Sequence, residues 1–355
     1  MKILQVIPSF CFGGAETMCE NLTYALTALG HQVCVVSLYN EHTPISQRME
    51  KAGIRFYYLD KKLGLDISMV PKLVKIMKDE KPDVVHTHLD VIKYAVAAAK
   101  LAGIKKCVHT VHNVAHKEAE GLARIVNRIY FNCGWAIPVA LSPEVRQTIS
   151  EVYGLPEAKI PVAYNGIDLS KCKPKKKYQI AGEAILLHVG RFNEQKNHRG
   201  LMRAFQLVLE EVSDCRLILL GDGELKSEIE EFARELDVIE RVDFLGNQAD
   251  VYPFLQHADI FLLPSVYEGM PMSIIEAMGS ALPIVATPVG GVPDMLTNGV
   301  SGLLTDLAPE RIRDGILELL RDASLREKLG RTAREDSVRF SAEYMAKEYC
   351  NVYTW

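Results

Sequence analysis

The chain has 355 residues, of which 48% are hydrophobic and 24% are charged, and its formal net charge is −4. This length predicts two domains that each bury a core, and the composition is typical of a soluble protein. No apolar run approaches the roughly 20 residues that span a bilayer, and "MKILQVIPSF" resembles a first strand rather than a signal peptide. The eight cysteines are scattered without a C-x-x-C pair, which argues against a disulfide framework or zinc site and favours the cytoplasm.

Charge is unevenly distributed along the chain. Residues 1–180 contain 24 Lys and Arg against 16 Asp and Glu, a balance of +8, whereas the remainder has a balance of −12. This asymmetry predicts an anionic partner for the first half. Because the basic residues lack interleaved aromatic residues and no recognition motif is present, we expect no nucleic acid, and an anionic membrane surface fits better. The basic and apolar stretches 61–78 and 121–131 are candidates for that contact; the alternative is that they are ordinary solvated helix faces.

Short β-branched runs alternate with amphipathic helical patterns along the whole chain. Such alternation predicts parallel sheets covered by helices on both faces, an α/β fold with doubly wound domains. The helical pattern over 15–30 ends at Gly30, a residue type that commonly stops helices. The predicted strands are 2–8, 32–39, 54–59, 83–88, 106–111, 136–141 and 161–165 in the first half, and 184–190, 215–221, 241–246, 259–264, 283–287 and 302–306 in the second.

A lysine-rich stretch that is poor in apolar residues, 165–182, separates the two halves. We predict a first domain over 1–170, a linker over 171–182 and a second domain over 183–340. The aromatic-rich segment 341–355 is predicted to form a helix that packs back onto the first domain, because no strand follows it.

The candidate site residues of the first half follow predicted strands, and parallel sheets bind ligands at the carboxyl ends of their strands. Gly13 and Gly14 open a helix after the first strand, where backbone amides can approach an anion; the alternative, which is the commoner meaning of such a pair, is a simple tight turn. The G-x-G-x-x-G pattern of nicotinamide dehydrogenases is missing. Among four histidines at strand ends, His112 is the best functional candidate because it lies beyond its strand. The others, His86, His88 and His109, are expected in the core, and no carboxylate or cysteine completes a metal site.

Two cations follow the first strand of the second half. Arg191 and Lys196 stand just before a helix, where charge-assisted hydrogen bonds suit a diphosphate; the alternative is a solvated loop. The stretch "GDGE", 221–224, forms another glycine turn into a helix. Since no Asp-x-Asp pair is present to hold Mg²⁺, we expect Arg191 and Lys196 to take the place of the metal.

The stretch "SVYEGMPMSIIEAM" places Glu268 and Glu276 around a Gly-x-Pro turn. Carboxylates at the end of a strand can accept hydrogen bonds from vicinal hydroxyls, as they do from ribose. Two such carboxylates beside a pair of cations that clamps a diphosphate indicate two hydroxyl-bearing groups, a sugar on one side of the diphosphate and a ribose on the other. This combination predicts a nucleotide sugar as the ligand. The alternative is a capping box, in which Ser273 and Glu276 bond reciprocally at the start of a helix.

Taken together, these motifs resemble those of the retaining glycosyltransferases of family four. The resemblance covers nearly the whole chain and rests on the Glu, seven residues, Glu signature of 268–276, with "VGRFNEQKN", "GDGE", "YNGID" and "TPVGG" in the expected order. It implies the GT-B fold, in which two Rossmann-like domains face each other across a cleft.

The resemblance also implies roles for individual residues. Arg191 and Lys196 would hold the donor diphosphate, Glu276 the ribose, and Glu268 would lie near the transferred sugar. His112 would match the family's active-site histidine near the C6 hydroxyl, and the amides from Gly269 to Met272 would contact the sugar. The implied catalytic residues are His112, Arg191, Lys196 and Glu268, and the implied donor-binding residues are Gly13, Gly14, Gly190, Arg191, Lys196, Gly246, Glu268, Gly269, Met270, Pro271, Met272 and Glu276.

The implied activity is transfer of a hexose or N-acetylhexosamine from a UDP-sugar to a lipid-linked glycan acceptor, with retention through front-face attack. The implied reaction needs no metal and no cofactor, and the expected location is the cytoplasm, peripheral on the membrane. Two alternatives stay open. A GT-B nucleotide-sugar 2-epimerase would need acid and base carboxylates that we cannot place, and a non-catalytic nucleotide-sugar-binding subunit would not need its clamp residues.

Overall fold

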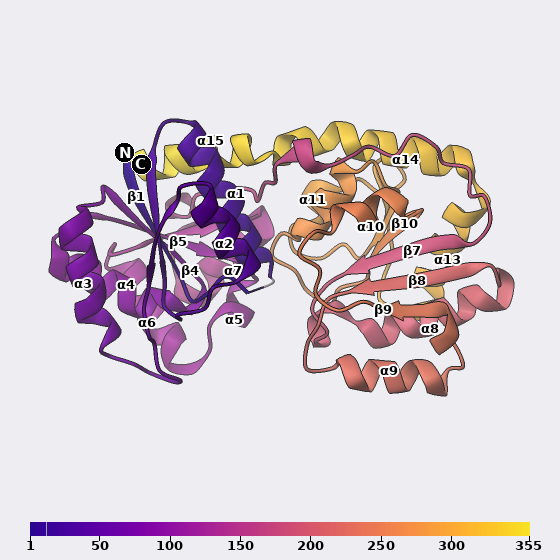
Figure 1. Ribbon diagram of the computed structural model, residues 1–355, viewed down its shortest axis with the longest axis horizontal. Helices are drawn as coiled ribbons and strands as arrows, with labels where there is room; N and C mark the ends of the chain where they lie inside the picture. The colour runs from indigo at the N-terminus through magenta and orange to yellow at the C-terminus, as the bar shows by residue number, and fades with distance from the viewer. Residues whose placement is uncertain (12) are drawn as a thin grey trace. The chain divides into compact units, whose positions relative to one another are not determined.

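The computed structural model describes residues 1–11 and 13–355, and the chain forms two compact units (Figure 1). Unit 1 consists of 1–166 together with 342–355, and unit 2 consists of 167–341. In the described part of the chain, each unit contains one parallel six-stranded sheet with helices on both faces. The predicted α/β class with two doubly wound units is therefore confirmed.

In unit 1 the strands lie in the order β3-β2-β1-β4-β5-β6, and all neighbours are parallel. This is the order of dinucleotide-binding sheets. The strands are β1 (Lys2–Ile7), β2 (Gln32–Ser37), β3 (Arg55–Tyr58), β4 (Val84–His88), β5 (Lys106–Val111) and β6 (Ile137–Ala140). The helices are α1 (Gly14–Ala28), α2 (Pro44–Lys51), α3 (Met69–Glu80), α4 (Ile92–Ala102), α5 (Ala115–Glu118), α6 (Gly121–Asn132), α7 (Pro143–Tyr153) and α15 (Ala342–Thr354).

Alternating residues of the strands of unit 1 supply a core on each face of the sheet. Leu4 and Val6 of β1 join the core beneath α3, α4, α6 and α7, whereas Ile7 joins a smaller core with residues of α1 and α2. Near-continuous apolar strands are buried in this way because helices cover both faces.

The C-terminal helix α15 belongs to unit 1 and packs against α1. Tyr349 and Tyr353 of this helix are buried, and their hydroxyls bond to polar side chains of β4 and β5. Buried polar groups are costly unless they are hydrogen-bonded, so these bonds let a polar strip of the sheet pack beneath a helix.

Unit 2 repeats the same strand order, β12-β11-β10-β7-β8-β9. Its strands are β7 (Ala184–Val189), β8 (Cys215–Leu220), β9 (Val242–Phe244), β10 (Ile260–Leu263), β11 (Ile284–Ala286) and β12 (Leu303–Leu304). Its helices are α8 (His198–Glu211), α9 (Lys226–Glu235), α10 (Tyr252–His257), α11 (Met272–Gly279), α12 (Val292–Met295), α13 (Pro309–Arg321) and α14 (Ala323–Asp336). The order reverses between β7 and β10, and ligands of open α/β sheets bind at such reversals.

The segment 171–182, which the sequence predicts as a linker, is instead packed on unit 2. Tyr178 is buried, its hydroxyl donates to the carbonyl of Ala281 at 2.9 Å, and its own carbonyl accepts from the guanidinium of Arg326 at 2.7 Å. Lys175 pairs with Asp259 at 2.9 Å. The lysine content misled the prediction, because Cys172 and Tyr178, which flank most of these lysines, are buried in the unit.

This assignment also reduces the charge asymmetry. The five lysines of 171–177 belong to unit 2, so unit 1 has 20 basic and 17 acidic residues, a balance of +3, and unit 2 has 21 and 28, a balance of −7. The balance of unit 1 alone is therefore a weaker indication of an anionic partner than the +8 counted over 1–180.

One predicted strand, 161–165, is not a strand. A single bridge joins Val162 to Ala140 at the end of β6, where the amide of Ala140 donates to the carbonyl of Pro161 at 2.9 Å. Proline lacks the amide that a longer ladder would need. Within the described residues, no helix combines the length and the apolar character required to cross a membrane.

Candidate functional site

The loops that follow β7 and β10 lie together at the strand reversal of unit 2. The amide of Val266, after β10, donates to the carbonyl of Gln195, after β7, at 2.8 Å. Parallel neighbours place their carboxyl ends at one edge of a sheet, which is why residues more than 70 positions apart in the chain meet here.

Lys196 and Glu268 form a largely buried ion pair at this edge. The ammonium of Lys196 lies 2.6 Å from Glu268 Oε1, and the two side chains are 14% and 5% exposed. Gln195 Nε2 donates to the other carboxylate oxygen at 3.1 Å. A buried charge is tolerated when it is paired and hydrogen-bonded, and here both conditions are met. The sequence predicts both charged residues for the site but does not reveal Gln195.

Arg191 has a different environment from Lys196. Its guanidinium pairs with Glu224 of the "GDGE" turn at 3.1 Å, and both side chains are exposed, at 69% and 57%. An exposed pair of this kind stabilises the fold little, so Arg191 is free to exchange its partner for a ligand. The two residues predicted to hold the diphosphate therefore lie on one loop, where the side chain of Lys196 is largely buried and that of Arg191 is exposed.

Close backbone approach explains the glycines of the surrounding loops. A Cβ on Gly290, whose φ is +59°, would lie 2.0 Å from the carbonyl oxygen of Glu268, and the amide of Gly291 donates to the carbonyl of Gly269 at 2.6 Å. A Cβ on Gly221, with φ +138°, would lie 2.0 Å from the carbonyl oxygen of Gly190. Only glycine fits such positions, so "TPVGG" and "GDGE" hold the turns that carry Glu268 and Arg191.

The predicted glycines Gly190 and Gly246 lie on this same edge. The amide of Gly190 donates to the carbonyl of Leu220 at 2.9 Å, and the amide of Gly221 donates to the carbonyl of Gly246 at 2.9 Å. The loops after β7, β8 and β9 are thereby connected through their backbones.

Helix α11 presents its first amides without a side-chain cap. The helix begins at Met272 and its N-cap is Pro271, which makes no side-chain cap hydrogen bond in the described structure. Ser273 is therefore already the second residue of the helix, and the capping box of Ser273 and Glu276 does not form. Gly269 and Met270 are buried in the turn before the helix. Uncapped amides at a helix N-terminus favour an oxygen-rich ligand.

Glu276 is a buried carboxyl on α11. Burial raises its pKa to about 8, with Lys171 acting in the opposite direction and Asp250 adding to the rise. In the part of the chain that the structure describes, no hydrogen bond or ion pair satisfies this carboxyl. A buried carboxyl without a partner is destabilising, and such groups are common where a ligand supplies the missing donors.

In unit 1, Gly13 and Gly14 lie at the start of α1. Gly13 is the N-cap residue with extended backbone, and Gly14 is the first residue of the helix. The side chain of Glu16 folds back over Gly13, since a Cβ there would lie 2.4 Å from Glu16 Oε2. In the described structure, the helix start is therefore occupied by a carboxylate of its own first turn. Residue 12 of the motif "PSFCFGGAE" lies outside the described residues.

The histidines of β4, of β5 and of the loop just beyond β5 form three separate sets of hydrogen bonds. His112 Nε2 lies 3.0 Å from His88 Nδ1, and His88 Nε2 lies 2.6 Å from Gln5 Oε1. His86 bonds instead to Thr110 and Tyr353, at 2.8 Å each. On the opposite face of the sheet, His109 Nδ1 lies 2.9 Å from the hydroxyl of Thr87.

Burial keeps these imidazoles neutral. It lowers the pKa of His112 and of His109 to about 3 each, with His109 adding to the effect on His112. Burial and the neighbouring histidines also lower the pKa values of His86 and His88. Neutral imidazoles can accept as well as donate hydrogen bonds.

One further carboxyl near His112 was not predicted from the sequence. Burial raises the pKa of Glu118 to about 7, while the backbone amides of His112 and Asn113 act to lower it. Glu118 therefore anchors the loop that carries His112. In the described residues, no cluster of three or more His, Cys, Asp or Glu side chains has an arrangement that could hold a metal ion.

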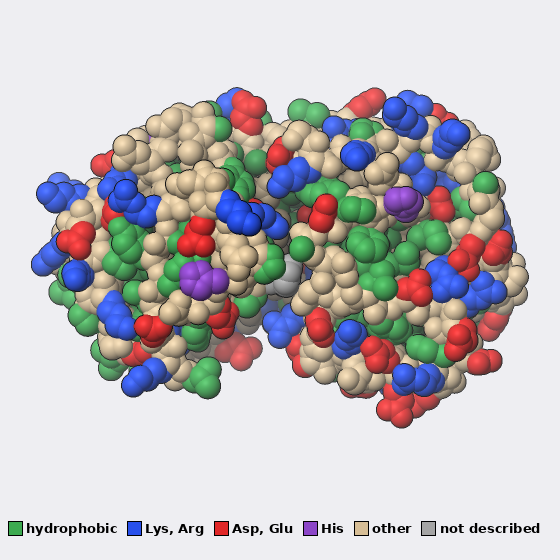
Figure 2. Space-filling model, in the orientation of Figure 1, with side chains coloured by type: hydrophobic (Ala, Val, Ile, Leu, Met, Phe, Trp, Pro, Cys, Tyr) green, Lys and Arg blue, Asp and Glu red, His purple; other side chains and the backbone are tan. Residues whose placement is uncertain are grey.

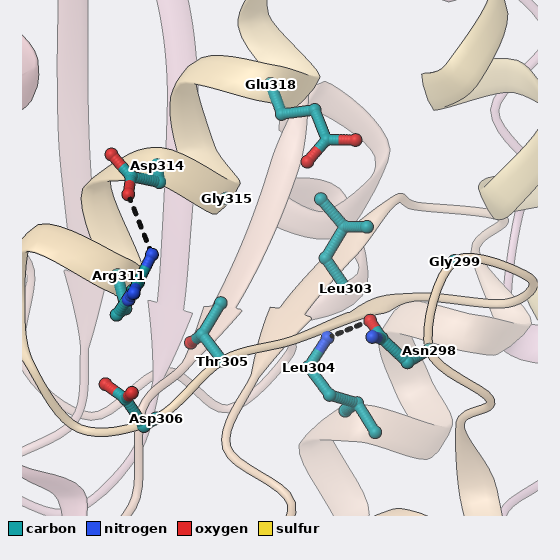
Figure 3. A pocket seen from close by; sticks show the side chains of 10 residues that line it. All are labelled: Asn298, Gly299, Leu303, Leu304, Thr305, Asp306, Arg311, Asp314, Gly315 and Glu318. Atoms are coloured by element: carbon teal, nitrogen blue, oxygen red, sulfur yellow. Dashed lines mark hydrogen bonds and ion pairs between the residues drawn. The ribbon is translucent and has the colours of Figure 1, made fainter.

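A cavity of about 450 Å³ lies elsewhere in unit 2, beside the edge strand β12 and helix α13 (Figure 3). Arg311 and Asp314 face each other across 3.8 Å on one side of it. None of the predicted site residues lines this cavity. Its lining residues are Asn298, Gly299, Leu303, Leu304, Thr305, Asp306, Arg311, Asp314, Gly315 and Glu318.

Comparison with solved structures defines the fold class. The chain is similar to the crystal structure of Anabaena Alr3699/HepE in complex with UDP and glucose, with a TM-score of 0.86, 20% sequence identity, and coverage of 100% of this chain and 99% of that one. The molecule therefore has the GT-B fold of glycosyltransferases.

Sequence comparison defines the family. Residues 12–171 match the model of Glycosyltransferase Family 4, and residues 171–336 match that of Glycosyl transferases group 1. The chain belongs to the glycosyltransferases of family 4, so the predicted resemblance is confirmed.

The names of two curated relatives state different acceptors for the sugar. N-acetyl-alpha-D-glucosaminyl L-malate synthase from Bacillus anthracis is 29% identical over 96% of this chain and 93% of its own length. UDP-Gal:alpha-D-GlcNAc-diphosphoundecaprenol alpha-1,3-galactosyltransferase from Escherichia coli is 30% identical over 68% of this chain and 67% of its own length.

Proposed function

We propose that this glycosyltransferase moves a hexose or N-acetylhexosamine from a UDP-sugar to a lipid-linked glycan, with retention of anomeric configuration. The observation that carries the proposal is the arrangement at the strand reversal of unit 2. A buried Lys196–Glu268 pair lies on the same edge as uncapped helix amides, and α11 also carries the unpartnered carboxyl of Glu276. In this proposal Lys196 binds the diphosphate, Glu268 and the helix amides bind the sugar, and Glu276 binds the ribose. The UDP in the complex of the Anabaena protein and the lipid-linked acceptor in the name of the Escherichia coli relative support this assignment.

In the proposed front-face reaction, the acceptor hydroxyl attacks the anomeric carbon from the side that UDP leaves. The bond between the sugar and the phosphate oxygen breaks, and a phosphate oxygen takes the proton of the acceptor hydroxyl. Arg191 and Lys196 stabilise the negative charge of the departing diphosphate, Glu276 holds the ribose, and Glu268 and the backbone amides of Gly269, Met270 and Met272 orient the sugar. Positioning and charge stabilisation then supply the catalysis, and no covalent nucleophile or metal is required.

The first test is release of UDP from UDP-glucose, UDP-galactose and UDP-N-acetylglucosamine, with and without acceptors. We expect one donor to be hydrolysed slowly alone and consumed faster with a polyprenyl diphosphate-linked saccharide, giving a product with the anomeric configuration of the donor. Activity should persist in EDTA. An inverted product, or activity that EDTA abolishes and Mg²⁺ restores, would contradict the mechanism.

The same experiment separates the alternatives. An epimerase would convert UDP-N-acetylglucosamine to its 2-epimer without any acceptor, and a non-catalytic subunit would bind UDP without releasing it from any donor. Glycosylation of L-malate instead of the lipid-linked saccharide would assign a soluble acceptor, the one in the name of the Bacillus anthracis relative.

We further propose that unit 1 docks on the cytoplasmic face of an anionic membrane, where a lipid-linked acceptor is presented. Leu63, Leu65 and Ile67 are highly exposed in the loop before α3, and Leu63 reaches 94%. The exposed lysines of α3 accompany them, namely Lys72, Lys75 and Lys78. In Figure 2, basic and hydrophobic side chains are interleaved along the edge of unit 1 where α3 lies in Figure 1.

A second exposed apolar group lies on α6 and shares a neighbour with the first. Leu122, Ile125 and Ile129 are exposed on α6. The hydroxyl of Tyr130 on that helix donates to the carbonyl of Lys93 on α4 at 3.3 Å, and the adjacent Tyr94 accepts from the amide of Asp66 in the first loop at 3.0 Å. Both groups therefore flank α4, and both follow carboxyl ends of strands, the edge that also carries His112.

Vesicle sedimentation tests the docking. We expect binding to anionic but not neutral vesicles, and weaker binding as salt shortens the screening length from about 10 Å at 0.1 M to about 3 Å at 1 M. Each basic side chain near the surface contributes about 1 kcal/mol. Reversing Lys72 and Lys75 to glutamate should therefore reduce binding by at least about 30-fold. The matched control is Lys176→Glu with Lys177→Glu on unit 2, which makes the same charge change and should leave binding unaltered. If both double variants lost vesicle binding equally, the loss would be a general effect of net charge, and the proposed docking surface on unit 1 would be wrong.

A further inference from the structure

The interior of unit 1 contains a chain of three polar side chains that ends at His112. Gln5 of β1 and His88 of β4 are completely buried, and His112 is partly buried beyond the end of β5. The contacts run from Gln5 Oε1 to His88 Nε2, 2.6 Å, and from His88 Nδ1 to His112 Nε2, 3.0 Å. Within the described residues, Nδ1 of His112 has no partner.

The proton positions along this chain follow from the chemistry of the groups. An amide oxygen only accepts hydrogen bonds, so His88 must donate to Gln5 from Nε2. A neutral imidazole carries one proton, which leaves Nδ1 of His88 as an acceptor. His112 must then donate to it from Nε2, and its own Nδ1 is left bare.

The surroundings keep both imidazoles in the neutral form that these proton positions require. The ring centroid of His88 lies 4.3 Å from that of His86 and 5.2 Å from that of His112, so a proton on one of these rings would be a charge in a buried region, and protons on two neighbouring rings would place like charges in contact. His86 is itself tied to Thr110 and Tyr353 and does not enter the chain of bonds to His112.

We propose that Gln5, acting through His88, fixes His112 as the Nε2–H tautomer, so that bare Nδ1 accepts a hydrogen bond from a hydroxyl of the transferred sugar. Gln5 and His88 are positioning residues in this account, because neither contacts the substrate. The sugar-facing half of the proposal rests on the proposed function, whereas the tautomer does not depend on it.

Nitrogen-15 NMR of ring-labelled histidine distinguishes the two tautomers directly, without substrate. We expect His112, assigned by the signals lost in His112→Gln, to carry its proton on Nε2 in the unaltered protein. Gln5→Met keeps the length of the side chain but removes the acceptor, so His112 should become a mixture of tautomers. A proton on Nδ1 of His112 in the unaltered protein overturns the relay, because it requires the Gln5 amide to be turned with its nitrogen toward His88.

Kinetics with the donor tests the second half. Loss of one oriented hydrogen bond should lower the turnover of Gln5→Met by about three- to tenfold, with the Kd for UDP unchanged because the base and phosphates are not involved. Gln5→Glu keeps an acceptor oxygen at the same place and should recover most of the turnover. Unchanged turnover in Gln5→Met, measured on an enzyme that does use a UDP-sugar, overturns the sugar-facing role.

The matched control is Thr87→Val. It removes a buried hydrogen bond to a different histidine, His109, on the other face of the same sheet. Its stability should fall about as much as that of Gln5→Met, while the His112 signals and the turnover stay as in the unaltered protein. A Thr87→Val enzyme with the same tautomer mixture and the same kinetic loss as Gln5→Met would attribute the effect to general loosening of the sheet and overturn the relay.

Discussion

Replacing Lys196 with alanine is expected to lower sugar transfer by at least about 10²-fold, since one preorganised charge at the leaving group stabilises the transition state by roughly 3 kcal/mol. The same change should lower the free energy of unfolding by about 3 kcal/mol, because it leaves Glu268, 5% exposed, as a buried carboxylate without its cation. Steady-state UDP release and chemical denaturation measure the two effects.

Arg191→Ala is the matched comparison for this prediction. Its pair with Glu224 is exposed, so the unfolding free energy should change by less than about 1 kcal/mol, whereas transfer should again fall strongly. A double variant, Lys196→Met with Glu268→Gln, removes both buried charges and should regain stability but not activity. If Lys196→Ala folds normally and keeps transfer within tenfold of the unaltered enzyme, Lys196 does not hold the diphosphate.

Glu276→Gln is expected to weaken UDP binding by at least about tenfold at pH 8, because bonds from ribose hydroxyls to an ionised carboxylate contribute about 1.5–3 kcal/mol. Burial raises the pKa of Glu276 to about 8, and we expect the ribose to bind its ionised form. UDP affinity should therefore rise with pH by up to tenfold per unit until about pH 8 and then level off, and this rise should vanish in Glu276→Gln. Calorimetric titrations between pH 6 and 8.5 measure both.

The same substitution should stabilise the ligand-free protein at pH 8. The folded pKa is raised above the unfolded value of about 4.3, so the contribution of this carboxyl is fully present below pH 4.3 and is lost as the pH rises through about 8. A glutamine is not ionised on unfolding, so Glu276→Gln should gain on the order of 3 kcal/mol in unfolding free energy at pH 8 and little at pH 4. Glu235→Gln, at an exposed position of α9, should change neither quantity. A variant that binds UDP normally and shows the pH dependence of the unaltered protein would mean that Glu276 does not contact the ribose.

Several features of the molecule were predictable because they depend on local sequence. The alternation of apolar strands with helices predicted both parallel sheets. The glycine turns and charged residues that follow the strands predicted that a site lies at one edge of the second sheet, where Arg191, Lys196, Glu268 and the start of α11 are found. This works because strand and helix periodicities are local, and a parallel sheet brings all of its strand ends of one kind to one edge.

The errors and omissions arose where distant segments decide the environment of a residue. The capping box of Ser273 and Glu276 fits the spacing, but the turn before α11 packs against Gly290 and makes Pro271 the N-cap. Likewise, the lysines of 171–177 indicate a linker, although Tyr178 beside them is held by Arg326 from a segment almost 150 residues away.

Gln5 shows the same division between sequence and tertiary structure. A glutamine inside "KILQVI" is an unusual polar residue in a buried strand, and that signal was available in the sequence. Its partner was not, because only the register of β1 against β4 places Gln5 beside His86 on the face that α1 and α15 cover, within reach of His88. The sequence determined which residue types stand at the strand ends, and the tertiary structure decided which of them are buried, paired and neutral, since burial and pairing depend on neighbours that local patterns do not specify.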